Sequence, residues 1–593
     1  MNKDMVKIKI NGSEYKVASG ITVLKACRDK GINIPALCYL EGVSERAACS
    51  LCVVEITGAR TLLRSCVTKV REGMEIFTST ERVRRARRVI LELILANHPK
   101  DCLSCLRNQS CDLQKLAEEL GIEDIRYDRT RKKDLDLDET SPSITRDPNK
   151  CILCGRCVEV CSQIQTVNAI DFSGRGLSTR ISTFFDKGLG KLECVNCGQC
   201  VLVCPTGALV ERSDIKKVWK ELADQDKFVV VQTAPAIRAA IGEEFGIKAG
   251  TPTTGKLASA LRRMNFDRIF DTQFAADLTI IEEGTELISR IKNKGVLPLV
   301  TSCSPGWIKF GETFFPDILD HVSTCRSPQQ MFGPVVKTYY AEKMNIDPRK
   351  IVVVSIMPCT AKKFEAQRPE MNSAFLYWKD KLGLKKSDSF QDVDYVLTTR
   401  EAARMIRESG LDFSSLPEEG FDDPLGESTG AATIFAATGG VMEAALRSAY
   451  FYLTGTELEN IDLTSVRGLE KIKEAEVNIN GLKIRVAVTS GLGNARKVLE
   501  DVRDGKSPYH FIEIMACPGG CIGGGGQPIP TNDAIRQKRI QAVYAEDRSM
   551  QYRQSHQNPS LDKLYKEFLK EPNGHLAHQL LHTHYKKRVY TEI

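Results

Sequence analysis

The sequence predicts a multidomain chain in which small α+β domains rich in cysteine precede a larger α/β domain. Four groups of closely spaced cysteines lie before residue 210. From about residue 228, apolar segments of strand length alternate with helical stretches, as in α/β domains. Three later cysteines each stand just past the carboxyl end of such a strand, where open α/β sheets hold their ligands: Cys303, Cys359 and Cys517.

The 21 cysteines of this 593-residue chain indicate metal binding rather than disulfides, because disulfide-rich secreted chains are normally short. The opening MNKDMVKIKINGSEYKV contains no apolar signal segment and no twin arginine, and no apolar stretch is long enough to span a bilayer. We therefore expect a cytoplasmic protein with reduced thiols. The net charge of +7 is small for this length, which argues against nucleic acid as the main partner.

The first cysteine group follows a predicted hairpin, with its turn at Asn11-Gly12, and a short helix in ITVLKACRDKGI. Its spacing is C-x10-C-x2-C-x13-C, formed by Cys38, Cys49, Cys52 and Cys66. This order resembles the [2Fe–2S] ferredoxin domain of respiratory complex I and its relatives rather than the plant-type spacing. A zinc site is the alternative, although zinc sites usually pair two short C-x2-C elements. Cys27 falls outside the pattern and is expected to be a buried core thiol.

The second group has the spacing H-x3-C-x2-C-x5-C and consists of His98, Cys102, Cys105 and Cys111. One histidine and three cysteines could form a structural zinc site. The same spacing follows the [2Fe–2S] domain in complex I and in iron hydrogenases, and this resemblance implies a [4Fe–4S] cluster. A neutral imidazole ligand in place of a thiolate should raise the potential of that cluster.

The third and fourth groups both fit C-x2-C-x2-C-x3-C, the run of bacterial two-cluster ferredoxins, and Pro205 follows the second run as it does there. In that fold the fourth cysteine of each run binds the other cluster. One [4Fe–4S] cluster is therefore assigned to Cys151, Cys154, Cys157 and Cys204. The other is assigned to Cys194, Cys197, Cys200 and Cys161. The segment RTRKKDLDLDETSPSITRDPNK before these runs is interpreted as a solvated connector.

The basic helix expected in ERVRRARRVILELILANH has two interpretations. It could dock an acidic electron carrier, or it could simply be a solvated amphipathic helix. The later strands are expected in KFVVVQ, VLPLVTS, KIVVVSIMP, DYVLTT, IRVAVTS and FIEIMA, with a helix in PAIRAAIGEEFG. Cys521 and four consecutive glycines follow Cys517, and bare backbone of this kind can pack closely against a bulky inorganic cofactor.

Three segments of the α/β part resemble the signature loops of [FeFe]-hydrogenases: TSCSPGW at 301–307, MPCTAKKFE at 357–365 and EIMACPGGCIGGGGQP at 513–528. The resemblance implies a two-lobed α/β domain with an H-cluster, which is a [4Fe–4S] cube joined to a diiron unit with CO, cyanide and a bridging dithiolate. It implies that Cys359, Cys517 and Cys521 hold the cube and that Cys521 bridges to the diiron unit. Lys362 would hydrogen-bond a cyanide. Met357 and Met515 would pack against the diiron unit.

The first loop departs from the family, which usually has Cys-Cys before the proline where this chain has Cys303-Ser304. By position, Cys303 matches the thiol that relays protons and Ser304 matches a cube ligand. An alkoxide is a poorer ligand than a thiolate for a soft iron–sulfur site. Either the serine ligates, or Cys303 becomes the ligand and the relay is altered; both remain candidates.

The resemblance also implies a proton path to the surface through Glu283, Glu286 and Ser323, and paired acids with a hydroxyl suit stepwise transfer. Cys325 has no assigned role. The implied domains are 1–80 [2Fe–2S] ferredoxin-type, 81–125 [4Fe–4S] with one histidine ligand, 140–212 two-[4Fe–4S] ferredoxin-type, 220–530 H-cluster domain and 531–593 a C-terminal segment like a small subunit.

The expected function is the reaction of H₂ to two protons and two electrons, with one [2Fe–2S] and three accessory [4Fe–4S] clusters carrying the electrons. Domain order and the C-terminal segment resemble the catalytic subunit of multisubunit NAD(P)-linked, electron-bifurcating hydrogenases. SGLGNAR at 490–496 lacks the third glycine and the acidic partner of a dinucleotide site, so flavin and NAD(P) would bind partner subunits. These subunits would reduce NAD(P)+, ferredoxin or both, and maturation proteins would also be partners. The alternatives are a stand-alone ferredoxin-dependent hydrogenase and a non-catalytic electron-relay protein.

Overall fold

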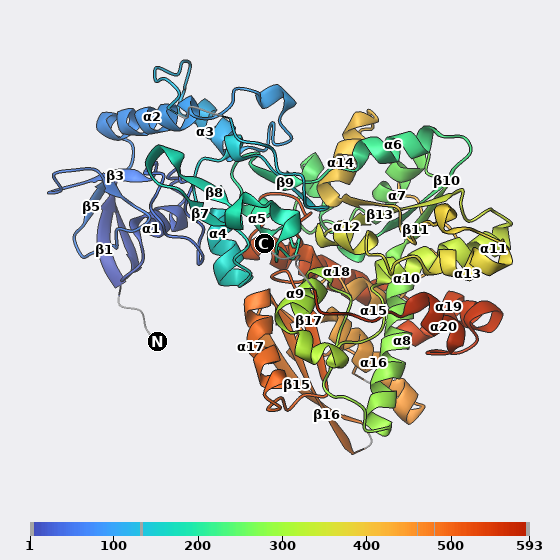
Figure 1. The fold of residues 1–593 in the computed structure, drawn as a ribbon. Helices are drawn as coiled ribbons and strands as arrows, with labels where there is room; N and C mark the ends of the chain where they lie inside the picture. The colour runs from blue at the N-terminus through green and yellow to red at the C-terminus, as the bar shows by residue number, and fades with distance from the viewer. Residues whose placement is uncertain (1–4, 131–133, 459, 480, 589–593) are drawn as a thin grey trace.

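The computed structural model describes residues 5–130, 134–458, 460–479 and 481–588 (Figure 1). The expected domains 1–80 and 531–593 and the expected connector at 129–150 thus lie partly outside the described residues. The N-terminal domain contains a five-stranded sheet in the order β2-β1-β5-β3-β4. Its strands are β1 Met5–Ile10, β2 Ser13–Ala18, β3 Val53–Ile56, β4 Leu63–Arg64 and β5 Glu75–Phe77.

The predicted hairpin is confirmed, because Ile10 pairs with Ser13 across the turn and Asn11 and Gly12 both have positive φ. Helix α1 (Val23–Asp29) begins where the Thr22 side chain accepts a hydrogen bond from the Lys25 amide. Cys27 lies on this helix with no exposed surface, as predicted for a core thiol.

Two helices follow, α2 (Glu81–Ala96) and α3 (Asp112–Glu119). Most arginines of α2 face solvent, but Arg87 is buried against β3. The ferredoxin-type part consists of two small antiparallel ribbons and two short helices. The first ribbon is β6 (Ile144–Arg146) with β9 (Leu209–Glu211), the second is β7 (Asp171–Ser173) with β8 (Arg180–Ser182), and the helices are α4 (Arg156–Glu159) and α5 (Gln199–Val203).

The larger part has two lobes, each built on a four-stranded sheet. The first sheet is fully parallel in the order β11-β10-β13-β14, and its central strand IVVVSIM is buried throughout, as parallel strands covered on both faces are. Its strands are β10 Phe228–Thr233, β11 Arg268–Asp271, β13 Ile351–Met357 and β14 Tyr395–Thr398. Its helices include α6 Ile215–Ala223, α7 Thr254–Arg263, α10 Pro328–Val335, α11 Ala341–Met344, α12 Ala361–Ala366, α13 Ser373–Lys381 and α14 Thr399–Glu408.

The second sheet has the order β12-β17-β16-β15, with only β15 antiparallel to its neighbour. Its strands are β12 Leu299–Val300, β15 Ile472–Ile479, β16 Leu482–Ser490 and β17 Phe511–Met515. Helices of this lobe are α9 Pro305–Phe314, α15 Gly430–Ile434, α16 Gly440–Thr454 and α17 Leu492–Arg503. The long, largely buried α8 (Thr272–Lys292) packs against both α10 and α16 and so joins the lobes (Figure 1).

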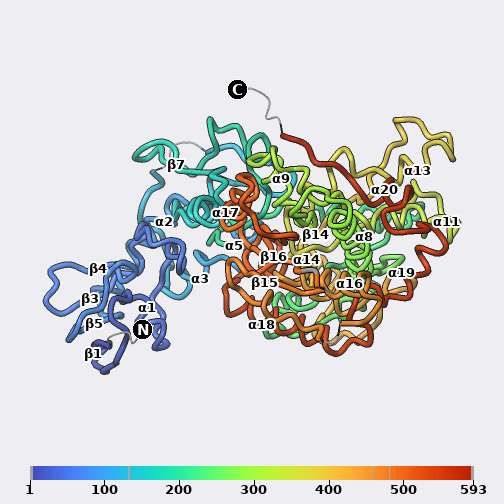
Figure 2. The backbone as a smooth tube through the Cα atoms, turned by 90° about the horizontal axis from the view of Figure 1, so that it is seen from below, coloured from blue at the N-terminus to red at the C-terminus, as the bar shows by residue number. Residues whose placement is uncertain are grey.

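The C-terminal segment forms α18 (Asp533–Ser549), α19 (Pro559–Leu564) and α20 (His575–Leu581). Arg539 of α18 is fully buried, pairs with Glu243 at 2.7 Å and donates to the Ile522 carbonyl at 2.8 Å. Beyond α20 the chain runs back across the molecule towards α9 (Figure 2). Within the described residues, none of the helices combines the length and the apolar character that crossing a membrane requires.

Two details of the sequence-based prediction were wrong. PAIRAAIGEEFG forms two 3₁₀ turns, Pro235–Ile237 and Ile241–Phe245, instead of a helix. Tertiary contacts override helix propensity there, because Arg238 between the turns is buried and pairs with Asp271 at 2.6 Å. The strand expected in VLPLVTS shrinks to Leu299–Val300, since the proline before it has no amide hydrogen to pair. The prediction also missed the edge strands β11 and β15.

Candidate active site

The first cysteine group gathers in the core of the N-terminal domain. The Cys38 and Cys49 sulfurs are 3.4 Å apart, and the hydrogen bond from Cys38 lowers the pKa of Cys49 to about 5. The hydrogen bond from Cys66 lowers the pKa of Cys52 to about 7. Thiols that stabilise one another's anions this closely are suited to share a metal cluster.

A buried cation stands beside this group. The Arg87 guanidinium of α2 donates to the carbonyls of Leu51 and Val53, at 3.1 and 2.7 Å, on either side of Cys52. Burial lowers its pKa to about 10, and the Cys52 thiol opposes that shift. Both sequence-based interpretations of α2 concerned its exposed face. The structure shows that one arginine of this helix points inward, next to a candidate cluster ligand.

The third and fourth groups line two separate cavities in the ferredoxin-type part. One cavity is lined by Cys151, Cys154, Cys157 and Cys204, and the other by Cys161, Cys194, Cys197 and Cys200. The fourth cysteine of each run has therefore crossed to the other run's set. These are the two sets that the spacing predicts, brought together by the fold.

The second group lies against the segment that follows Cys204. The Cys111 sulfur is 3.6 Å from the Pro205 carbonyl, and a side chain on Gly207 would meet the Cys105 sulfur at 2.7 Å. His98 follows the end of α2, and Cys102 is exposed. The [2Fe–2S]-type domain reaches the same neighbourhood, because Arg46 pairs with Glu159 of α4 at 2.6 Å. Both N-terminal groups thus adjoin the Cys151 set.

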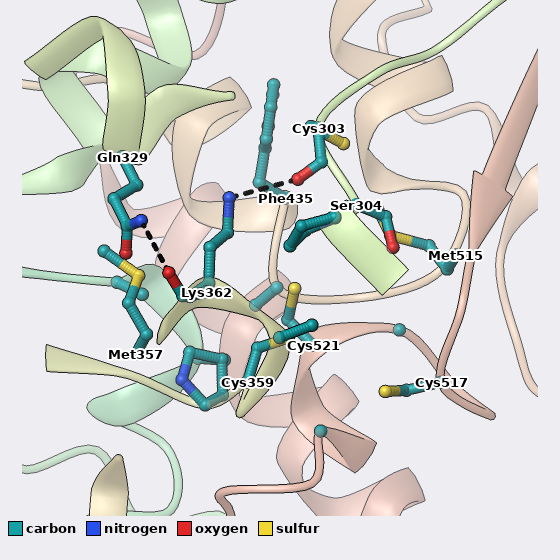
Figure 3. Close-up of a pocket in the computed structure, with 18 of the residues that line it drawn as sticks. Cys303, Ser304, Gln329, Met357, Cys359, Lys362, Phe435, Met515, Cys517 and Cys521 are labelled. Carbon is teal, nitrogen blue, oxygen red and sulfur yellow. Dashed lines mark hydrogen bonds between the residues drawn. The ribbon is translucent and has the colours of Figure 1, made fainter. Parts of the chain in front are cut away.

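The three signature loops meet at one cavity between the lobes (Figure 3). The loops leave β12, β13 and β17 at their carboxyl ends, as expected for an open α/β sheet. The cavity has a volume of about 80 Å³ and mainly apolar walls. Its lining includes Cys303, Ser304, Met357, Cys359, Lys362, Met515, Cys517 and Cys521.

The Cys359, Cys517 and Cys521 thiols interact electrostatically within this cavity. Burial raises the pKa of all three, to about 12 for Cys521. An apolar cavity that disfavours thiolates becomes a stable place for them only with a compensating cationic centre, and iron supplies one. Three soft donors around an apolar space are therefore a fitting cradle for an iron–sulfur group.

No three histidine, cysteine or acidic side chains of the described ranges converge at the spacing that a single metal ion needs. A [4Fe–4S] cluster does not require that convergence, because each of its ligands binds a different iron atom.

Lys362 holds its ammonium group at the cavity wall. The Nζ atom donates to the Cys303 carbonyl at 3.2 Å (Figure 3). It also pairs with Glu365 at 2.8 Å. Glu365 also accepts hydrogen bonds from Ser327 and Gln329. Both methionines are almost fully buried and line the same cavity.

Cys303 and Ser304 face different parts of the site. The Ser304 hydroxyl accepts a hydrogen bond from the Ala516 amide at 3.2 Å, next to Cys517. Burial raises the pKa of the Cys303 thiol well above the ordinary value, and the nearby Glu283 carboxyl and Cys521 thiol add to that increase. The Ser304 hydroxyl therefore contacts the loop of a candidate cube ligand, and Cys303 has both an acid and a candidate cube ligand near it.

The acids lead from the cavity towards the surface. Glu283 is 1% exposed, and burial raises its pKa to about 8, while Ser323 and the Ser302 amide act in the opposite direction. Ser323 donates to Glu286 at 2.8 Å, and Glu286 pairs with the partly exposed Arg290 at 2.7 Å. The structure thus brings the three predicted residues of the path together. Cys325, fully buried, lies with its sulfur 3.9 Å from Glu286.

The glycine run packs directly against backbone from two other loops. A side chain on Gly524 would meet the Pro358 carbonyl at 2.2 Å, and one on Gly525 would meet the Cys197 carbonyl at 2.3 Å. The run therefore brings the Cys521 loop, the Cys359 loop and the fourth cysteine group into contact. Sequence reasoning expected close approach to a cofactor and missed this contact between loops.

Sequence reasoning also missed three supporting residues. Glu365 lies one turn after Lys362 in MPCTAKKFE, which is a readable i, i+3 charge pair. Arg290 follows Glu286 at i+4 and gives the same signal. Gln329 lies on α10, far from Lys362 in sequence, and donates to the Lys362 carbonyl at 3.3 Å. No local sequence pattern predicts this contact.

Comparison with known proteins agrees with this arrangement. The model of the iron only hydrogenase large subunit, C-terminal domain, matches residues 227–525, and that of the iron hydrogenase small subunit matches 533–588. Further models match at 3–81 (2Fe-2S iron-sulfur cluster binding domain), 87–126 (NADH-ubiquinone oxidoreductase-G iron-sulfur binding region) and 150–208 (4Fe-4S dicluster domain).

The chain is 48% identical to the NADP-reducing hydrogenase subunit HndD of Solidesulfovibrio fructosivorans, covering 98% of this chain and 99% of that protein. It is 41% identical to iron hydrogenase 1 of Clostridium pasteurianum, covering 98% and 100%. A solved structure of apo [FeFe]-hydrogenase HydA1 from Chlamydomonas reinhardtii matches 64% of this chain and 100% of that chain, with TM-score 0.56 and 42% identity. Cytosolic iron-sulfur assembly component 3 of Rattus norvegicus is 30% identical over 61% of this chain and 75% of its own length.

Proposed function

This chain belongs to the iron-only hydrogenases, and from that premise we propose that it interconverts H₂ with protons and electrons for an NAD(P)-linked assembly of subunits. It is a hydrogenase catalytic subunit with iron–sulfur domains at its N-terminus. The observation that carries the detailed proposal is the convergence of the three signature loops on one apolar cavity.

In the proposal, Cys359, Cys517 and Cys521 hold the [4Fe–4S] cube of an H-cluster, and Ser304 occupies the fourth position. The hydrogen bond from the Ala516 amide to the Ser304 hydroxyl supports this placement on the cube side. Cys521 would also be the residue that holds the diiron unit. When bound, this group with its CO, cyanide and dithiolate ligands supplies the site where H₂ is bound and split.

The side chains around the cavity have separate tasks. Lys362 presents a cation to an anionic ligand, and its pair with Glu365 fixes the orientation of the ammonium group. Met357 and Met515 keep water away from the site. An apolar, closed surrounding strengthens each of these electrostatic interactions.

Protons travel along side chains of this chain. Burial keeps Glu283 protonated at neutral pH because its pKa is about 8, so Glu283 releases its own proton towards Ser323 as it takes up one from the Cys303 thiol. Ser323 then links this side to Glu286, whose carboxylate meets Arg290 near the surface. Cys303 retains the relay role in this assignment, and Ser304 accounts for the altered loop.

Electrons travel through one [2Fe–2S] and three [4Fe–4S] clusters at the four cysteine groups, within domains 1–80, 81–125 and 140–212. The H-cluster domain 220–530 and the C-terminal segment 531–593 complete the chain. The packing of Gly525 on Cys197 supports entry from the Cys194 set into the H-cluster site. Partner subunits that bind flavin and NAD(P) accept the electrons, and maturation proteins supply the diiron unit. The similarity to a subunit named as NADP-reducing supports an assembly of several subunits. The many free thiols favour a reducing cytoplasm.

Infrared spectroscopy on the anaerobically matured chain tests the proposal. Absorption where iron-bound CO and cyanide stretch is expected, and the Cys521→Ser variant should lack it while keeping its accessory clusters. The maturation proteins are first shown to activate a known hydrogenase. If this chain then carries all its accessory clusters but shows no such bands, the proposed H-cluster is contradicted. A non-catalytic iron–sulfur protein is the second candidate, because an iron-sulfur assembly component is 30% identical over 61% of this chain.

A further inference from the structure

A large basic cavity lies outside the catalytic site. It measures about 980 Å³ and is open to solvent, and three separate parts of the chain form its walls. The ferredoxin-type part contributes Lys191 and Arg212, the catalytic part contributes Lys309, Arg326 and Arg368, and the C-terminal segment contributes Lys586, Lys587 and Arg588. Figure 2 shows how the C-terminal segment reaches this place, running from α20 towards α9.

Acidic side chains neutralise only part of this charge. Glu312 is paired with Arg368 and Arg588, Glu370 also pairs with Arg368, and Arg326 pairs with Asp392. In the described part of the chain no acidic side chain pairs with Lys191, Lys309, Lys586 or Lys587. Arg212 donates only to the carbonyls of Glu139 and Ser141. A surplus of about five cations therefore surrounds the cavity.

Lys309 is the most unusual of these cations. Its side chain is 4% exposed and stacks on the Phe364 ring at 4.6 Å, with no carboxylate partner among the described residues. A buried ammonium without an anion is costly and marks a place where an anion is expected. Helix α9, which carries Lys309, packs against the fourth cysteine group, since a side chain on its Gly306 would meet the Cys197 Cβ atom and the Val195 carbonyl at 3.7 Å. The cavity thus lies beside the fourth cysteine group.

Both helices under the cavity start at the catalytic loops. Helix α9, which carries Lys309 and Glu312, begins directly after Ser304. Helix α12, which carries Phe364, begins after Cys359 and packs against α9. A molecule in this cavity would therefore stand next to the cluster ligands of the Cys194 set and close to the H-cluster loops, and far along the chain from the N-terminal clusters.

We propose that this basic cavity docks an acidic electron-carrier protein, which exchanges electrons directly with the cluster of the Cys194 set. The proposal rests on the proposed function, because it needs a cluster at that set. In the direction of H₂ formation, two reduced carriers each give up one electron, and the two electrons combine with two protons at the catalytic site. This port is separate from the one used by the subunits at the N-terminal domains.

The distribution of the charges favours a protein over a small anion. Lys191 and the lysine pair Lys586 and Lys587 are exposed at the rim and come from different parts of the chain. Rim charges of this kind steer a partner with an extended carboxylate surface and mainly change its association rate. A phosphate site would instead gather backbone amides and side chains at one point.

The experiment compares two double variants of the full-length, matured enzyme. K586E/K587E reverses two cations at the cavity rim, and K216E/K220E reverses two exposed lysines on α6, outside the cavity, as the matched control. H₂ formation is driven either by a reduced acidic ferredoxin or by reduced methyl viologen, which is a small cation. K191E, from the opposite wall, is measured in parallel.

We expect the KM for the acidic carrier to rise about tenfold in K586E/K587E and in K191E at low salt, with kcat retained. The difference in carrier KM from the unmodified enzyme should disappear at about 0.5 M salt, where screening of the charges is nearly complete. The cavity variants should form H₂ from reduced methyl viologen at the rate of the unmodified enzyme. The control variant K216E/K220E should have the same carrier KM as the unmodified enzyme. If the unmodified enzyme forms no H₂ from reduced methyl viologen, that result contradicts the hydrogenase function itself and not the docking site.

An unchanged carrier KM in both cavity variants would overturn the proposal. So would an equal rise in the control, because the effect would then be one of total charge. If the carrier KM is unchanged while inorganic phosphate binds the unmodified enzyme and fails to bind K586E/K587E, the cavity is a small-anion site, and the proposal is equally overturned.

Discussion

The buried carboxyl of Glu283 links proton transfer to stability, and its replacement by glutamine separates the two. Burial raises the pKa of Glu283 from 4.5 to about 8. In the unfolded chain the same carboxyl ionises at the ordinary value, so folding must keep it protonated against the solution. The cost is absent below about pH 4.5, grows as the pH rises towards 8 and stays constant above that.

The magnitude follows from this difference. Each pH unit above the ordinary pKa costs about 1.4 kcal/mol, so the cost is about 1.4 kcal/mol at pH 5.5 and about 4 kcal/mol at pH 7.5. Glutamine has the same shape and no charge to suppress. Glu283→Gln should therefore stabilise the catalytic part, with a gain that increases with pH over this interval. The same variant should lose most of its H₂ formation, because an amide cannot pass the proton on.

Urea unfolding of the chain produced without maturation measures the gain. The three tryptophans, Trp219, Trp307 and Trp378, all lie in the catalytic part, so their fluorescence reports on that part alone. Glu500→Gln, which changes an exposed carboxyl on α17, is the control. A gain of the same size at pH 5.5 and 7.5, or none at either, would refute the argument that folding holds Glu283 neutral.

Three further outcomes are expected. Ser304→Cys supplies a thiolate where the structure has a hydroxyl and should slow the loss of iron to a chelator, measured by iron release over time; equal rates would argue against a ligand role for position 304. Cys161→Ser and Cys204→Ser should each remove about four iron atoms, from different clusters, and electron paramagnetic resonance should show a different signal lost in each; loss of the same signal would contradict the crossed assignment. Gly525→Ala should destabilise the catalytic part by about 1–3 kcal/mol in the urea assay, because the new methyl group would lie 2.3 Å from the Cys197 carbonyl; an unchanged midpoint would mean that the loops separate freely.

The spacing of the cysteines predicted which of them lie together, because the ligands of one cluster must satisfy a fixed geometry. Two short runs were enough to predict that Cys161 and Cys204 each join the cysteines of the other run. The fold places the same two sets around two cavities. The strand-end positions of Cys303, Cys359 and Cys517 followed from strand pattern alone. These predictions rest on local sequence, which determines local backbone.

Features that depend on distant partners could not be predicted. The 3₁₀ turns around Arg238 follow from its pairing with Asp271 and Glu546, far away in sequence. Edge strand β15 carries alternating acidic residues and reads as a surface segment. The basic cavity likewise joins Lys191, Lys309 and Lys586, which no sequence window contains together.

The C-terminal segment has a consequence for assembly. The family model that matches it is named for a small subunit, whereas here residues 533–588 continue the chain of the catalytic domain. Its anchors, such as Arg539 on Glu243 and Tyr565 on Glu282, are therefore intramolecular. A tethered segment meets its binding surface at an effective concentration on the order of millimolar, whatever the dilution of the protein. Association of this segment is thus independent of expression ratios, and one molecule of it is always present for each catalytic domain.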